Sequence, residues 1–90
     1  LLLIAVGHTD EGRVVLNELL TAAERADRAD ACLEIGESLS SIHQFDIALD
    51  VFRRGKNIAR RIRDADLISA IDDSVRNTDE RIEQRQQQAR

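Results

Sequence analysis

The feature that most constrains the fold is a match of the chain to itself at a shift of 36 residues. This single shift aligns the whole chain without a gap, and the apolar positions stay in phase. The identical pairs include Leu3 and Leu39, Asp10 and Asp46, Val15 and Val51, Ala23 and Ala59, Ala29 and Ala65, and Ile35 and Ile71. An internal period of this length indicates one supersecondary unit that is repeated and stacked on its neighbours.

The repeated unit is predicted to be helical. The 90 residues contain no Pro and only four Gly, so helix breakers are few, and the apolar residues are mostly Ala, Leu, Ile and Val. Helices are expected over about 10–26, from Asp27 as a cap to Gln44, from Phe45 or Asp46 to Ile62, and from a cap at Asp64 or Asp66 onward. Leu1–Val6 is interpreted as the tail of a first helix, with a buried strand as the alternative. The prediction is therefore an all-α chain of about five helices.

Apolar stripes of different width distinguish the helices. The stripe over 10–26 is broad, which suggests contacts with neighbours on two sides. The last helix has a narrow stripe spaced 3, 4, 3 and 4 residues apart, formed by Ile68, Ile71, Val75, Thr78 and Ile82. Its other positions are polar, and it continues into a Gln-rich tail. A one-sided helix of this kind is typical of the end of a solenoid.

Small and large apolar residues alternate over 29–64 in a way that resembles the tetratricopeptide repeat (TPR). Gly36, Ala48 and Gly55 occupy positions that are small in that family. Cys32, Ile35, Leu39, Phe45 and Phe52 occupy positions that are large and apolar in it. Cys32 and Leu39 replace usual aromatic residues, the usual closing proline is absent, and Asp72 stands where the third repeat should have a small residue.

The resemblance implies a TPR-like antiparallel helix-hairpin array, an α-solenoid fragment with a polar capping helix at its C-terminal end. Residues 1–28 would be a partial first repeat, 29–64 a complete repeat, and 65–90 the capping helix and polar tail. Another α-solenoid or a plain antiparallel helical bundle is the alternative architecture.

The resemblance also implies a protein-interaction module that binds a peptide or a helix of a partner protein on a concave surface lined by first helices. On this sequence that surface holds Asp30, Leu33, Glu37, Ser40, Ser41, Asp66, Ser69, Asp73, Arg76 and Asn77, with an apolar end formed by the first residues. The expected partner has an apolar anchor beside Lys or Arg. A merely solvated spacer face is the alternative.

Two other roles are open. The apolar N-terminal end could drive self-association into a homodimer through Leu1, Leu2, Ile4 and Ala5. The chain could also be the sensor domain of a larger signalling or transcription-regulating protein.

Several function classes find no support in the residues. The net charge of −4 argues against a nucleic-acid binder, and the Arg-rich segment 53–63 lacks interleaved aromatic residues. The single cysteine, Cys32, is expected to be buried, and no His, Cys or Asp cluster has metal-ligand spacing. No catalytic motif is present, so neither an enzyme nor a cofactor is predicted. Without a membrane-spanning segment or signal peptide, a cytoplasmic protein is expected.

Overall fold

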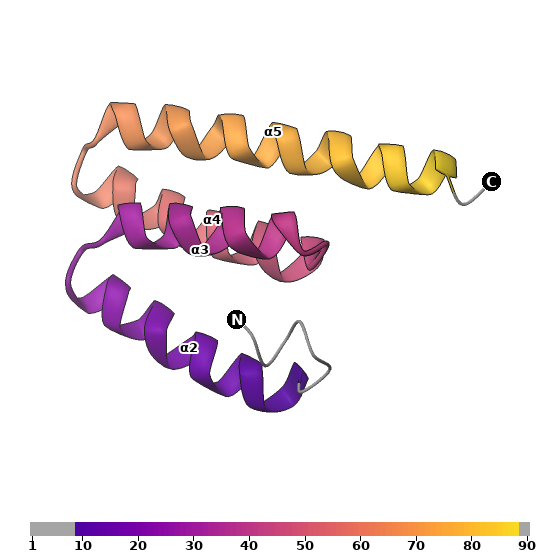
Figure 1. The fold of residues 1–90 in the computed structure, drawn as a ribbon. Coiled ribbons are helices and arrows are strands. Elements are labelled where there is room, and N and C mark those ends of the chain that lie inside the picture. Colours follow the sequence, from indigo (N-terminus) through magenta and orange to yellow (C-terminus); the bar gives the residue numbers. More distant parts are fainter. Residues whose placement is uncertain (1–8, 89–90) are drawn as a thin grey trace.

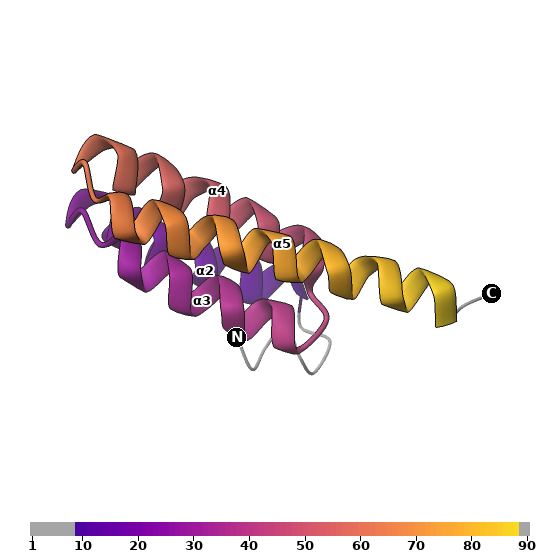
Figure 2. The same cartoon turned by 90° about the horizontal axis from the view of Figure 1, so that it is seen from above.

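Residues 9–88 are described by a computed structural model, in which this part of the chain consists of helices joined by short turns (Figure 1). It contains four helices: α2 (Thr9–Arg25), α3 (Ala29–Ser41), α4 (Phe45–Arg61) and α5 (Ala65–Gln88). Consecutive helices run antiparallel, with α2 at one edge, the α3–α4 pair in the middle and α5 at the other edge (Figures 1 and 2). The all-α prediction is confirmed. The helix expected at Leu1–Val6 lies outside the described residues, so a fifth helix stays a prediction.

The 36-residue period of the sequence reappears in the bounds of the helices. Thr9 and Phe45 begin α2 and α4, Arg25 and Arg61 end them, and Ala29 and Ala65 begin α3 and α5. Both α2 and α4 have 17 residues. Only α5 departs from the pattern, since its 24 residues continue well beyond the 13 of α3. Its C-terminal end therefore projects past the turn that joins α3 to α4 (Figure 2).

The three turns share one hydrogen-bonding pattern, the Schellman motif. Each has a left-handed non-glycine residue, namely Asp27 (φ 56°), His43 (φ 63°) and Arg63 (φ 60°). The next residue donates its backbone N–H five residues back, as from Gln44 to Leu39 at 2.9 Å. These bonds satisfy carbonyls that the helix end would leave without a partner. Three equal turns give equal hairpins, which explains why the helix bounds recur.

The capping predictions were half right. Asp64 caps α5, because its carboxylate accepts the backbone N–H of Leu67 at 3.1 Å. Asp27 as a cap of α3 was wrong. It occupies the left-handed position of the preceding turn, and the N-cap residue of α3 is Arg28, whose side chain makes no capping bond. A turn geometry that usually takes glycine is here adopted by aspartate, which tolerates it better than most residues.

The core is formed where α3 and α4 approach closely. Phe52, Leu39 and Cys32 are fully buried there, together with Ala48 and Ala59. Two glycines permit this approach. A Cβ atom at Gly36 would lie 2.3 Å from Cε1 of Phe52, and one at Gly55 would lie 2.7 Å from Cβ of Cys32. The small residues therefore set the distance between the two helices.

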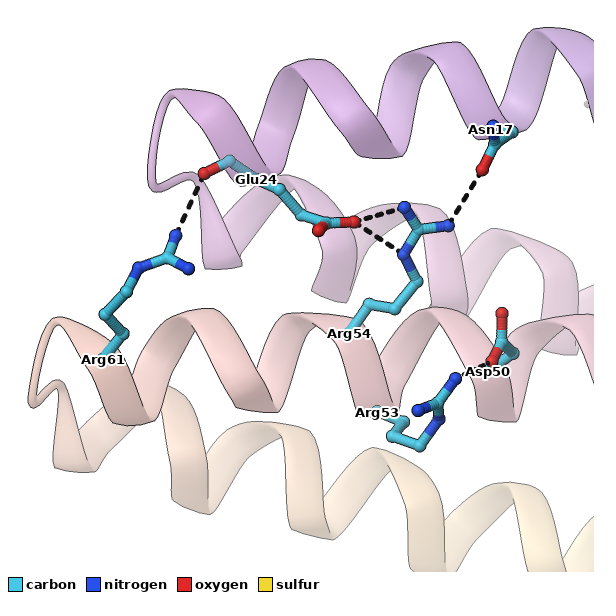
Figure 3. A network of polar contacts seen from close by, with 6 residues as sticks. All are labelled: Asn17, Glu24, Asp50, Arg53, Arg54 and Arg61. Carbon is cyan, nitrogen blue, oxygen red and sulfur yellow. Dashed lines mark hydrogen bonds and ion pairs between the residues drawn. The ribbon is translucent and has the colours of Figure 1, made fainter.

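Arginines of α4 connect the edge helix α2 to the rest of the molecule (Figure 3). Arg54 forms an ion pair with Glu24 and donates to Oδ1 of Asn17 at 3.2 Å. Arg61 pairs with Asp27 and donates to the carbonyl oxygen of Glu24 at 3.0 Å. Beneath these bonds α2 buries a short apolar row, Leu16, Leu20 and Ala23. Polar contacts thus surround a small apolar interface.

Candidate partner-binding face

The parallel helices α3 and α5 lie side by side and form a shallow polar pocket of about 210 Å³. We call this surface the α3–α5 face. Its lining residues are Glu37, Ser40, Ser41, Ser74, Asn77, Thr78 and Arg81, with Phe52 of α4 beneath them. Hydroxyl, amide and guanidinium groups predominate, so the pocket offers mainly hydrogen-bonding groups above one aromatic ring.

A directed chain of hydrogen bonds crosses the α3–α5 face. The Thr78 hydroxyl donates to the Ser74 carbonyl at 2.9 Å, so at its 3.1 Å contact with Ser40 it must accept. The Ser40 hydroxyl in turn accepts from Nη1 of Arg81 at 3.1 Å. Ser40 and Thr78 are 4% and 1% exposed. The buried Ser40 hydroxyl, itself bonded to Thr78, therefore orients the Arg81 guanidinium at the surface.

A second pocket of about 570 Å³ continues the α3–α5 face toward the C-terminal end of α5. It shares Ser40, Ser41 and Arg81 with the first pocket. The additional lining residues are His43, Gln84, Arg85 and Gln88. The only acidic lining residue of the two pockets is Glu37, which accepts a hydrogen bond from Ser74 at 3.0 Å. The combined groove therefore has one acidic end and one basic end.

The structure brings together four of the ten residues predicted for partner binding. Glu37, Ser40, Ser41 and Asn77 line the first pocket. The other six are not among the lining residues of either pocket: Asp30, Leu33, Asp66, Ser69, Asp73 and Arg76. Of these, Leu33 packs against the core, and the rest are exposed on the N-terminal parts of α3 and α5. The self-association residues Leu1, Leu2, Ile4 and Ala5 lie outside the described residues.

Ion pairs offset the acidic charge expected on this surface. Both guanidinium contacts from Arg28 to Asp30 measure 3.1 Å, and Arg76 pairs with Asp73 at 2.5 Å. The hydrogen bond from Arg28 lowers the pKa of Asp30 and opposes its desolvation. Each pair is local, two or three residues apart, and largely exposed. Two of the four predicted acidic residues are therefore already matched by a cation of their own helix or turn.

Half of the six cations in the segment 53–63 contact neighbouring elements of the fold. Arg54 and Arg61 bind α2 and its turn, Lys56 pairs with Asp72 of α5 at 2.6 Å, and Arg53 pairs with Asp50. Three of these four cations bridge two elements of the fold. The structure therefore assigns them to the assembly of the helices.

Sequence reasoning missed the residues at the C-terminal end of the face. Ser74, Thr78 and Arg81 follow one another at intervals of four and three residues, so they lie on one side of α5. Thr78 was predicted only as part of the apolar stripe. The signal that could have found them was this polar residue within an apolar row, since buried hydroxyls need partners.

The described residues offer no thiol, metal or membrane-spanning site beyond this face. Cys32 is fully buried, and burial raises the pKa of its thiol. Among the side chains described, no three His, Cys, Asp or Glu residues gather as a metal site. No helix within 9–88 has the length and apolar character to cross a membrane.

Comparisons with protein-family models, curated proteins and solved structures found no match to this chain.

Proposed function

We propose that the chain is a protein-interaction module, a TPR-like helical array that binds an extended peptide segment of a partner in the groove of the α3–α5 face. The observation that carries the proposal is the pair of continuous pockets along α5, of about 210 and 570 Å³. Pockets lined mainly by hydrogen-bonding groups suit a peptide whose backbone and side chains are held by many hydrogen bonds. The 36-residue recurrence of the helix bounds supports the repeat architecture.

The charges of the groove specify the orientation and the chemistry of the peptide. Arg81 and Arg85 at one end attract a carboxylate, either an acidic side chain or the peptide's terminus. Glu37 at the other end attracts a lysine or an arginine. From the sequence, the expected partner has an apolar anchor beside Lys or Arg. The charges of the groove retain the basic partner residue and add a carboxylate at the opposite end.

The hydrogen bond that orients Arg81 favours peptide binding, because it reduces the conformational entropy that this side chain loses when a peptide binds. A free arginine side chain loses roughly 0.5–1.5 kcal/mol of conformational freedom when a ligand immobilises it. The hydrogen bond to Ser40 already restricts the Arg81 side chain before a peptide binds, so less conformational freedom is lost on binding. A peptide that reaches Arg81 thus meets a donor group that already points into the groove.

The test is a selection of peptides from a random library against the whole chain, followed by calorimetric affinities for variants. We expect the enriched peptides to carry an acidic group at one end and a cation several residues away. Arg81→Gln should weaken the selected peptide about tenfold, the loss expected for one charged hydrogen bond. Ser40→Ala should weaken it less, since the guanidinium remains but is no longer held.

Arg60→Gln is the matched control. Arg60 is an exposed arginine of α4 and is not a lining residue of either pocket. Its replacement removes the same charge from the protein without touching the groove, so the affinity should not change. Equal losses from Arg81→Gln and Arg60→Gln would mean that only the overall charge matters, and the proposal would then be refuted. Failure to enrich any peptide would refute it as well.

A further inference from the structure

The outer side of α2 carries an exposed apolar row that the peptide groove does not use. We call it the α2 strip, formed by Val15, Leu19 and Ala22 of α2 and by Ala26 in the turn that follows. Val15 is 43% exposed and Leu19 is 49% exposed. All four positions are exposed in the structure, although the sequence predicts an apolar stripe for contacts on two sides of this helix. Contiguous apolar residues at helical spacing commonly mark a docking surface.

The equivalent positions of α4, 36 residues later, can be compared with the α2 strip, because other helices pack around α4. Val51 and Ile58 of α4 lie 36 residues after Val15 and Ala22, and they are 0% and 1% exposed. Gly55 corresponds to Leu19 and is buried against Cys32 of α3. The fold therefore covers three of the four equivalent positions around α4, and only Ile62, the counterpart of Ala26, stays 40% exposed. The same side of α2 faces outward at all four positions. Because α2 has Leu19 where α4 has a glycine, a helix that covers the α2 strip cannot approach α2 as closely as α3 approaches α4.

We propose that a second copy of the chain covers the α2 strip, with the two α2 helices packed antiparallel about a two-fold axis. The strip is spaced 4, 3 and 4 residues apart, the repeat of two helices that wind around each other. An antiparallel pair that is centred on the strip sets Leu19 opposite Ala22 and Val15 opposite Ala26 of the other copy. Each layer then combines one larger and one small side chain, which is good packing complementarity.

The charges beside the α2 strip match the same arrangement. Glu18 and Arg25 are both exposed, lie seven residues apart and flank the strip on one side. In an antiparallel pair, Glu18 of one copy comes next to Arg25 of the other, and the two-fold axis repeats the contact. In a parallel pair the two charged flanks would lie on opposite sides of the interface, so this contact would not form. A helix that complements itself in both size and charge has a second copy as its natural partner.

The test is the solution mass of the whole chain, measured by light scattering or sedimentation over a hundredfold concentration range. We expect a monomer–dimer equilibrium. Leu19→Lys should remove the dimer, because it sets a charge into the centre of the apolar contact. Ile42→Lys is the matched control, since Ile42 is also a large exposed apolar residue but lies at the end of α3 and not on α2. This control should dimerise like the unchanged chain, and circular dichroism should show that both variants remain helical.

A charge exchange tests the antiparallel geometry itself. Glu18→Arg alone and Arg25→Glu alone each create two like-charge contacts across the axis, and each should weaken the dimer several-fold. The double variant restores opposite charges and should recover the original dissociation constant. A monomer at every concentration would overturn the proposal, and so would a dimer that Leu19→Lys leaves intact. A dimer that the double variant does not recover would overturn the antiparallel arrangement.

Discussion

Replacement of Gly55 by alanine gives the sharpest test of how closely α3 and α4 pack. The new Cβ would lie 2.7 Å from Cβ of Cys32, whereas non-bonded carbons prefer about 3.5–4.0 Å. Both atoms are fixed to helical backbones, so no side-chain rotation can relieve the contact. The two helices would have to separate by about 1 Å at this point.

Two opposing effects set the magnitude. Alanine favours a helix over glycine by about 1 kcal/mol, whereas overpacking a filled core typically costs about 1–3 kcal/mol. Because the clash joins two backbone-fixed atoms, we take the upper part of that range and expect a net loss of about 1–2 kcal/mol. For a chain of this size the melting temperature should fall by about 5–15 °C.

Thermal and urea unfolding, followed by circular dichroism, measure this loss. Asn57→Ala is the matched control, an exposed position of α4 where alanine should slightly stabilise the protein. In a Cys32→Gly background the clashing atom is absent, so Gly55→Ala should no longer destabilise. In a Cys32→Ala background the atom remains, and so should the loss. If Gly55→Ala alone raised the stability by about 1 kcal/mol, the close approach of the two helices would be refuted.

Three further perturbations follow from particular contacts. Thr78→Val leaves the Ser40 hydroxyl without its acceptor and should lower the free energy of unfolding by about 1 kcal/mol. If urea unfolding showed the same stability for the variant and the unchanged chain, the buried hydrogen-bond chain would be contradicted. Arg54→Gln should lower the free energy of unfolding by about 1 kcal/mol or less at low salt, and by less at high salt. Arg53→Gln is the nearly neutral control, because Arg53 pairs only with an exposed residue of its own helix. Equal effects of the two substitutions would count against the connection of Arg54 to α2. Burial raises the pKa of the Cys32 thiol above its ordinary 9.0, so the folded state holds the proton more tightly than the unfolded state. The difference in unfolding free energy between the unchanged chain and Cys32→Ala should therefore be constant below about pH 9 and narrow above it, and a difference that widens there would have the wrong sign.

The helical class and the period could be predicted from the sequence because they depend on spacing alone. The shift that pairs Val15 with Val51 also relates the first residues of α2 and α4. The turns could not be predicted in detail. Their left-handed residues are Asp27, His43 and Arg63 in place of the glycine that usually indicates this geometry, so the sequence shows no distinctive signal there.

The face was predicted in part for a similar reason. Projection of helix positions found Glu37 and Asn77, since that step needs only the helical period. Arg81 was missed because its role depends on how far α5 extends past α3 and on the register between them. Neither quantity is a property of one helix. The pairing of Asp73 with Arg76 could have been anticipated, because residues three apart on a helix are neighbours.

Amide chemical-shift mapping with a selected peptide tests whether the α3–α5 face receives the partner. We expect the shifted amides to cluster around Ser41, Asn77, Arg81 and Arg85, and the amides of the α2 strip to keep their chemical shifts. Shifts concentrated on α2, with the α3–α5 face unchanged, would contradict this expectation.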